Sequence, residues 1–103
     1  MYIYNITTNI EESVNDSCLD WMKETYIPAM IATGKFTKAL MTLVQVDEEM
    51  GGITYAVQYT AKSQADIQAF LKEDEAKFEL LNAKFQGKLV YFGTEMKIIH
   101  THE

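Results

Sequence analysis

The sequence predicts one α+β domain whose elements follow the order strand, helix, strand, strand, helix, strand. Four segments carry apolar or aromatic residues with the two-residue period of a strand, and two segments repeat them at steps of three and four, as amphipathic helices do. The length of 103 residues is that of one domain. A content of 48% hydrophobic and 23% charged residues is ordinary for a globular protein, which argues against disorder.

The first half of the chain predicts a strand and then a broken helix. Aromatic and aliphatic residues alternate with others over residues 2–8, which is typical of a strand. The helix is expected to begin with Ser13 as its N-cap, and its apolar stripe comprises Val14, Cys18, Trp21, Met22 and Thr25. Pro28 lacks an N–H group, so the helix should kink or end near residues 26–27 and restart with the proline in its first turn. Gly34 suits a left-handed helix end.

The second half predicts a hairpin, a helix and a last strand. Residues 36–46 are apolar on both faces, which predicts a strand buried on both sides, and the glycine-ended turn 47–52 connects it to a strand over 53–61. Ser63 caps the second helix, Asp74 on its apolar stripe predicts an exposed or bent middle, and Gly87 ends it. That stripe comprises Ile67, Phe70, Leu71, Phe78, Leu81 and Phe85. The last strand runs from Lys88 to about His100.

This element order predicts the ferredoxin-like βαββαβ arrangement, a four-stranded antiparallel sheet with both helices on one face. The helix-covered face should carry Tyr2, Tyr4, Ile6, Tyr55, Val57 and Tyr59. The opposite face should carry Ile3, Asn5, Thr7, Met41, Leu43, Ala56, Gln58 and Thr60, a mixture too apolar for an open surface and too polar for a second core. We therefore expect residues 1–103 to form a homodimer, a dimeric α+β barrel, with Asn5, Met41, Leu43 and Gln58 in the interface.

The charge balance excludes several function classes. Fifteen acidic and nine basic residues give a net charge of −6, whereas proteins that bind nucleic acid or anionic membranes carry basic surfaces. The first residues resemble no signal peptide, and no apolar run approaches the roughly 18 residues of a membrane span. We expect a cytoplasmic protein. The single cysteine, Cys18, has acidic neighbours, which predicts a thiol in the core or at its boundary rather than a reactive nucleophile.

Two segments resemble a known family. One runs from Trp21 through Met22 and Ile27-Pro28 to Thr33-Gly34-Lys35-Phe36, and the other is Gly52-Ile53-Thr54-Tyr55-Ala56-Val57-Gln58-Tyr59. Together they resemble an uncharacterised small bacterial domain-of-unknown-function family of the dimeric α+β barrel type, over nearly the whole chain. The resemblance implies the fold and carries no catalytic residue across. The wider kinship of that fold includes antibiotic-biosynthesis-type monooxygenases and muconolactone-isomerase-like enzymes, and a shared fold does not determine function.

Aromatic residues beneath the helices are the candidate ligand-binding set: Tyr4, Trp21, Tyr26, Tyr55 and Tyr59. Tyrosine hydroxyls in an apolar pocket could orient an aromatic ligand, or the rings could simply pack in the core. Asn5 and Gln58 should lie on one face of adjacent strands, where they would either hydrogen-bond across a dimer interface or anchor a ligand. His100 and His102 share a strand face at a spacing that a metal or haem could use, but two ligands do not make a site.

Three functional hypotheses follow. The first is a dimeric domain that binds a small apolar or aromatic ligand or a protein partner, with no catalytic residue and no cofactor. The second is a cofactor-independent monooxygenase or isomerase, which would need a cavity of at least roughly 300 Å³ between helices and sheet. The third is a metal or haem protein that uses the C-terminal histidine pair.

Overall fold

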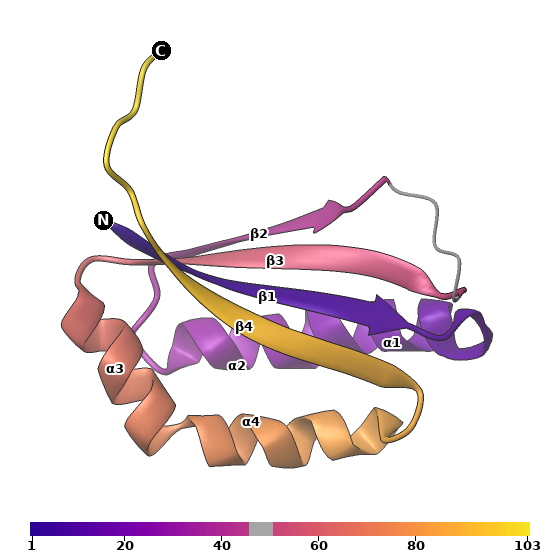
Figure 1. Cartoon of the computed structure of the whole chain (residues 1–103). Coiled ribbons are helices and arrows are strands. Elements are labelled where there is room, and N and C mark those ends of the chain that lie inside the picture. The colour runs from indigo at the N-terminus through magenta and orange to yellow at the C-terminus, as the bar shows by residue number, and fades with distance from the viewer. Residues whose placement is uncertain (46–50) are drawn as a thin grey trace.

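The computed structural model describes residues 1–45 and 51–103, and of residues 80–82 only the backbone. Figure 1 shows the order of the elements, which is β1 (Tyr2–Ile10), α1 (Asn15–Trp21), α2 (Ile27–Ala32), β2 (Lys38–Leu43), β3 (Ile53–Ala61), α3 (Gln64–Glu73), α4 (Glu75–Asn82) and β4 (Leu89–Lys97). Short 3₁₀ turns precede α1 (Glu12–Val14) and follow α4 (Ala83–Phe85), and a π-helical turn (Met22–Tyr26) joins α1 to α2.

The four strands form one antiparallel sheet in the order β2-β3-β1-β4. All the labelled helices lie on one face of this sheet, and the other face is uncovered (Figure 1). This topology is the ferredoxin-like arrangement, so the predicted fold class is confirmed. None of the described helices is both long and apolar enough to cross a membrane.

The core lies between the sheet and the helices, where the sequence placed the aromatic face. Tyr4, Val57 and Tyr59 are buried there, and Ile67 and Phe70 of α3 pack against them. Strand alternation accounts for this, because every second residue of β1 and β3 points to the helices. Each fully buried apolar side chain stabilises the fold by about 1.5–3 kcal/mol.

The first helix is broken near Pro28, as predicted. Its N-terminus and the set of residues that face the core differ from the prediction. Ser13 is not its N-cap, because the residue lies inside the 3₁₀ turn and its hydroxyl donates to the Glu11 carboxylate at 2.8 Å. Thr25 is exposed and does not belong to the apolar stripe. The reason is the π-helical turn, in which the Ile27 N–H donates to the carbonyl five residues earlier, so the inward position moves on to Tyr26.

The second helix behaves as predicted. The Ser63 hydroxyl accepts a hydrogen bond from the Asp66 N–H at 3.2 Å, which is an N-cap. The helix divides at Asp74 into α3 and α4, and Gly87 has a positive φ of 82° at the turn into β4. The predicted core position Leu81 falls among the side chains that the structure does not describe.

Two predictions about β2 are wrong. The strand is not buried on both sides, because it is an edge strand of the sheet and Leu40 and Leu43 are 50% and 54% exposed. Met41 and Leu43 do not lie on the uncovered face, because they pair directly with Val57 and Tyr55, which face the helices. When a strand carries apolar residues on both faces, its sequence does not show whether the odd- or the even-numbered residues point to the helices. Only the register of its pairing with the neighbouring strand decides this. Val46 and the acidic segment 47–49 lie outside the described residues.

Candidate functional site

A cleft of about 140 Å³ lies on the helix side of the sheet, between β1, β4, the π-helical turn and α4. Its walls come from parts of the chain that are distant in sequence. The residues that line it are Tyr4, Ile6, Tyr26, Phe70, Glu75, Phe78, Glu79, Tyr91 and Gly93.

Gly93 in the middle of β4 makes room for the Tyr4 side chain. A Cβ atom at this position would lie 2.2 Å from the Tyr4 hydroxyl oxygen and 2.5 Å from its Cζ. The phenol of Tyr4 therefore lies directly over the backbone of the edge strand. A glycine inside a strand often marks such a close approach, so Gly93 is a signal for this contact that is present in the sequence itself.

The aromatic wall is a continuous set of rings. Tyr4 contacts Phe70 with ring centroids 5.8 Å apart, Phe70 contacts Phe78 at 5.5 Å, and Phe78 contacts Tyr26 at 5.3 Å in an edge-on geometry. These separations are those of favourable aromatic pairs. The wall is thus held in place by the packing of its own members, and Tyr91, which is 40% exposed, stands at the outer side.

The π-helical turn places Tyr26 in this wall. Because the turn spaces its hydrogen bonds by five residues, the Trp21 and Tyr26 rings lie on the same helix face, 5.4 Å apart. π-helical turns are rare and are frequent at functional sites. The turn was not predicted from the sequence, where the apolar stripe was read with the ordinary helical period.

A narrow space of about 10 Å³ adjoins the cleft and is lined by Trp21, Tyr26 and Tyr59 among others. Tyr59 is fully buried, and its hydroxyl has no hydrogen-bond partner among the described residues. Burial, followed by the proximity of Tyr26, raises the pKa of Tyr59 far above the ordinary value of tyrosine. Its hydroxyl is therefore a neutral polar group in an apolar setting, and the space beside it is about the size of one water molecule.

Two carboxylates of α4 border the cleft, Glu75 and Glu79, which are one turn apart on the same helix face as Phe78. Burial raises the pKa of the Tyr4 hydroxyl, and the negative charge of Glu75 and of Glu95 raises it further. No basic residue lines the cleft in the part of the chain that the structure describes. The site is consequently aromatic inside and negatively charged at its border.

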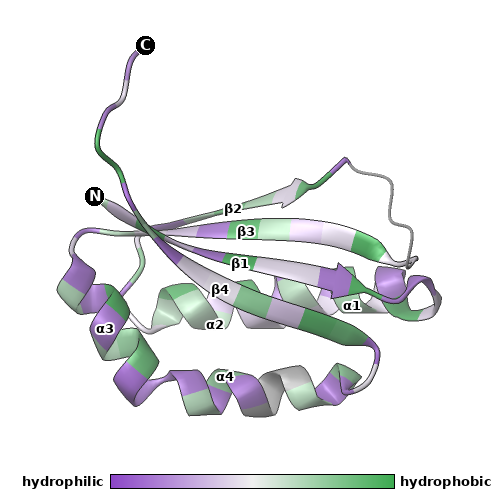
Figure 2. Cartoon of the chain, viewed as in Figure 1, coloured by the Kyte–Doolittle hydropathy of each residue, from purple (hydrophilic) through white to green (hydrophobic). Residues whose placement is uncertain are grey.

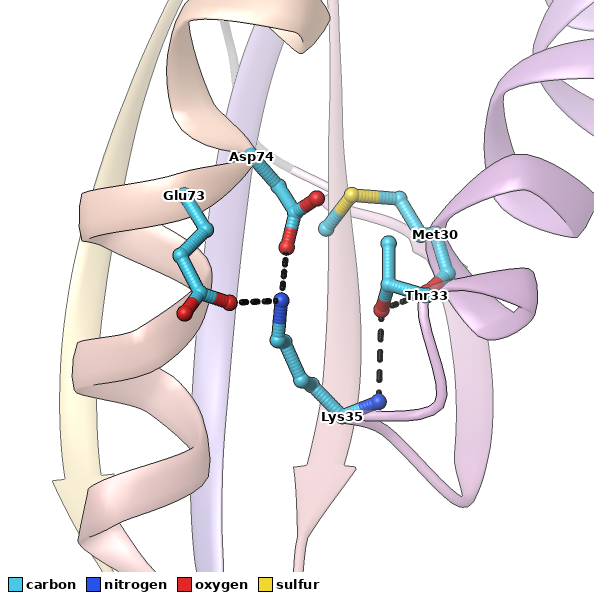
Figure 3. Close-up of polar contacts among 5 residues, drawn as sticks. All are labelled: Met30, Thr33, Lys35, Glu73 and Asp74. Atoms are coloured by element: carbon cyan, nitrogen blue, oxygen red, sulfur yellow. Dashed lines mark hydrogen bonds and ion pairs between the residues drawn. The ribbon is translucent and has the colours of Figure 1, made fainter.

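An ion pair ties the break between α3 and α4 to the loop after α2 (Figure 3). The Lys35 ammonium reaches from the loop after α2 to the Asp74 carboxylate and also lies 2.7 Å from a Glu73 oxygen. The backbone N–H of Lys35 donates to the Thr33 hydroxyl, and this hydroxyl donates to the Met30 backbone carbonyl at 2.7 Å. This chain of contacts links the end of α2 to the residue immediately before Glu75.

The structure brings together four of the five predicted ligand-binding residues. Tyr4 and Tyr26 line the cleft itself, and Trp21 and Tyr59 line its narrow extension. Tyr55 does not belong to this group, because its hydroxyl donates to the Asn15 side chain at 2.9 Å and so ties β3 to α1. Glu75, Glu79 and Gly93 were not among the predicted site residues. The position of Gly93 beside Tyr4 depends on how β1 and β4 pair, and that of the two glutamates depends on how α4 packs on the sheet.

The uncovered sheet face carries Asn5 and Gln58 on adjacent strands, as predicted, and the two residues pair directly across β1 and β3. The Asn5 side-chain amide donates to the Thr7 hydroxyl at 3.1 Å, and its buried carbonyl oxygen has no partner among the described residues. Exposed apolar side chains lie on the same face: Leu40 of the edge strand β2, and Val90 and Phe92 of β4, which are 70% and 61% exposed. The first half of β4 is accordingly one of the hydrophobic parts of the sheet in Figure 2.

The remaining candidates lie away from the cleft. Cys18 is fully buried, as predicted, and burial raises the pKa of its thiol. His100 and His102 are exposed, with ring centroids 6.2 Å apart, in the extended tail that follows β4 (Figure 1). The predicted last strand is therefore too long, since it ends at Lys97. In the described residues, no group of three metal-ligating side chains comes together.

Comparisons with known proteins agree with the fold. The sequence model of a protein family, the domain of unknown function DUF4286, matches residues 1–99. Among solved structures, HapK from Hahella chejuensis has a TM-score of 0.72 at 8% identity, covering 100% of this chain and 97% of its own. A dimeric ferredoxin-like protein from an uncultured marine organism has a TM-score of 0.71 at 7% identity, covering 100% and 99%.

A Bacillus cereus protein assigned as an antibiotic biosynthesis monooxygenase has a TM-score of 0.67 at 10% identity, covering 99% of this chain and 96% of its own. At such low identities these likenesses show the fold alone. No curated protein is significantly similar in sequence.

Proposed function

This chain belongs to the DUF4286 family, and we propose that it is a homodimeric binding domain that holds a small ligand in the cleft beneath its sheet. The observation that carries the proposal is the cleft itself, which is walled by Tyr4, Tyr26 and other rings. A concave site with apolar walls and a few polar groups is the usual form of a small-molecule site. The adjoining narrow space is lined by Tyr59, whose hydroxyl has no partner among the described residues and would be satisfied by a water molecule there.

The volume of the cleft limits what the ligand can be. About 140 Å³ is below the roughly 300 Å³ that pockets for drug-sized molecules occupy. A polyketide-sized substrate, as expected for a monooxygenase of this fold, is too large for it. The cleft suits one aromatic ring or one branched apolar group, so its size favours binding of a small ligand over the oxygenase hypothesis.

The second element of the proposal is that residues 1–103 pair with a second copy through the uncovered sheet face. Leu40, Val90 and Phe92 are exposed on it, and an exposed apolar patch on a sheet favours an interface. The unpartnered Asn5 oxygen supports the same conclusion, because a facing sheet can supply a donor. Met41 and Leu43 face the helix side and therefore lie outside this interface. The solved neighbours named as dimeric ferredoxin-like proteins are consistent with it.

Ligand binding is tested by thermal shift with a panel of small compounds that each contain one aromatic ring or branched alkyl group, neutral or charged. A ligand present at 100 times its Kd should stabilise the fold by about 2.7 kcal/mol. The Tyr91→Leu variant should lose the shift, whereas Tyr2→Leu, which changes a tyrosine outside the cleft, should keep it. If no compound stabilises the protein, or if both variants respond alike, the proposed site is wrong.

Pairing is tested by analytical ultracentrifugation at micromolar concentration. Phe92→Glu should convert a dimer into a monomer, since it places a charge in the most apolar part of the proposed interface. Ala76→Glu introduces the same charge on an exposed position of α4 and should leave the dimer intact. A wild-type protein that sediments as a monomer contradicts this part of the proposal.

A further inference from the structure

We propose that the cleft selects a small organic cation, an alkylammonium group, rather than a neutral or anionic ligand. The inference rests on the proposed function, because it names the class of ligand that the same cleft would hold. It depends on two features that lie together, the aromatic wall and the carboxylates of Glu75 and Glu79.

The aromatic wall offers a cation several ring surfaces. Tyr4, Tyr26 and Tyr91 contribute rings to the cleft, in addition to Phe70 and Phe78. The faces of aromatic rings are electron-rich and attract a cation within about 6 Å, most strongly when the ligand is desolvated. Cages of this kind are the common means by which proteins recognise quaternary ammonium groups. The ring contacts of 5.3–5.8 Å among Tyr4, Phe70, Phe78 and Tyr26 make the wall rigid before any ligand arrives.

The charges around the cleft exclude an anion. Glu75 is half-buried and Glu79 exposed, and both border the cleft on α4. Glu95 of β4 lies close enough to raise the pKa of Tyr4, although its carboxylate already accepts a hydrogen bond from Gln68 at 2.8 Å. A carboxylate or phenolate ligand would meet three negative groups here.

The basic residues of the chain do not supply the missing positive charge. Lys35 is held by Asp74 and Glu73 at the helix break. The Lys77 ammonium lies 6.0 Å from the centroid of the Phe78 ring, but Lys77 does not line the cleft. The aromatic wall and its two bordering carboxylates therefore have no positive counterpart on the cleft surface in the described part of the chain.

The volume selects among cations. A cleft of about 140 Å³ accommodates a trimethylammonium-sized head group and little more. A hydrated metal ion would gain nothing from aromatic walls, because hard cations prefer oxygen ligands. An alkylated ammonium is weakly hydrated, apolar at its surface and positively charged, so it matches both the rings and the carboxylates.

The test compares two probes of the same shape that differ in charge. Choline and its neutral carbon isostere 3,3-dimethylbutan-1-ol are titrated into the full-length protein by calorimetry at constant ionic strength. We expect choline to bind at least about tenfold more tightly, within the range of cation–π and carboxylate contributions. Glu75→Gln/Glu79→Gln should reduce this preference to about twofold or less. Glu12→Gln/Glu24→Gln removes the same charge from exposed positions outside the cleft and should preserve it.

Each outcome separates the two proposals. Equal binding of choline and the isostere overturns the cation selectivity and leaves the small-ligand cleft standing. If both double variants weaken the preference for choline equally, the preference reflects the overall charge of −6, and this result also overturns the cation selectivity of the cleft. Absence of binding by either probe, together with a negative compound panel, refutes the cleft as a binding site and the inference with it.

Discussion

Substitution of Gly93 by alanine tests whether the Tyr4 ring needs the missing side chain. The new Cβ would lie 2.5 Å from Cζ and 2.8 Å from Cε1 of Tyr4, whereas carbon atoms in contact prefer about 3.5–4.0 Å. The ring must therefore move by about 1 Å. It cannot do so freely, because it packs against Phe36 and Phe70 with centroids 6.4 and 5.8 Å away.

The expected cost of Gly93→Ala is that of overpacking, about 1–3 kcal/mol, which corresponds to roughly 4–8 °C in Tm for each kcal/mol. Urea unfolding at a fixed protein concentration measures it, since pairing would make stability depend on concentration. In the background of Tyr4→Leu, which has no atoms at the Cζ and hydroxyl positions, the same substitution should cost nothing. Any remaining effect should be a stabilisation of the strand by at most about 0.5–1 kcal/mol, because alanine loses less backbone entropy than glycine.

Lys97→Ala, at the exposed end of the same strand and outside both the cleft and the uncovered face, is the matched control and should stay within about 0.5 kcal/mol of the wild type in both backgrounds. If Gly93→Ala costs as much with leucine at position 4 as with tyrosine, the close approach of Tyr4 is not the reason for the glycine.

Three further outcomes are expected. Tyr59→Phe should not lower stability at pH 7, because the hydroxyl is buried without a partner. Above the ordinary tyrosine pKa of 10.0, only the unfolded chain releases the Tyr59 proton. Tyr59 should therefore lower the stability of the wild type by about 1.4 kcal/mol for each further pH unit. Urea unfolding of Tyr59→Phe at alkaline pH should lack this contribution to the pH dependence. Tyr55→Phe should cost about 1 kcal/mol in urea unfolding through loss of the bond to Asn15, with ligand shifts unchanged. Ser63→Ala should cost about 1 kcal/mol and Ser63→Thr much less, since threonine keeps a hydroxyl that accepts from the Asp66 N–H and donates to the Asp66 carboxylate; equal losses would contradict the capping role.

Features that depend on a few neighbouring residues were predicted well. The helix break follows from the ring of Pro28, the second helix start from the Ser63 cap, and its division from Asp74 on an apolar stripe. Each of these is a local interaction within about one helical turn. There are two exceptions. Ser13 does not cap the first helix, because its hydroxyl donates to Glu11 instead. The π-helical turn was not predicted, because apolar residues spaced by four and by five can both be fitted to residues 21–26.

The sequence by itself determined the element order, the antiparallel topology and the aromatic face, since these depend on periodicity and on short connections. Only the tertiary structure decided to which face of the sheet Met41 and Leu43 point, because a shift of one residue in strand pairing exchanges the two faces. The same holds for the cleft. Tyr4 and Gly93 come from opposite ends of the chain, and the pairing of β1 with β4 brings their backbones together and gives the Tyr4 ring its place over the glycine.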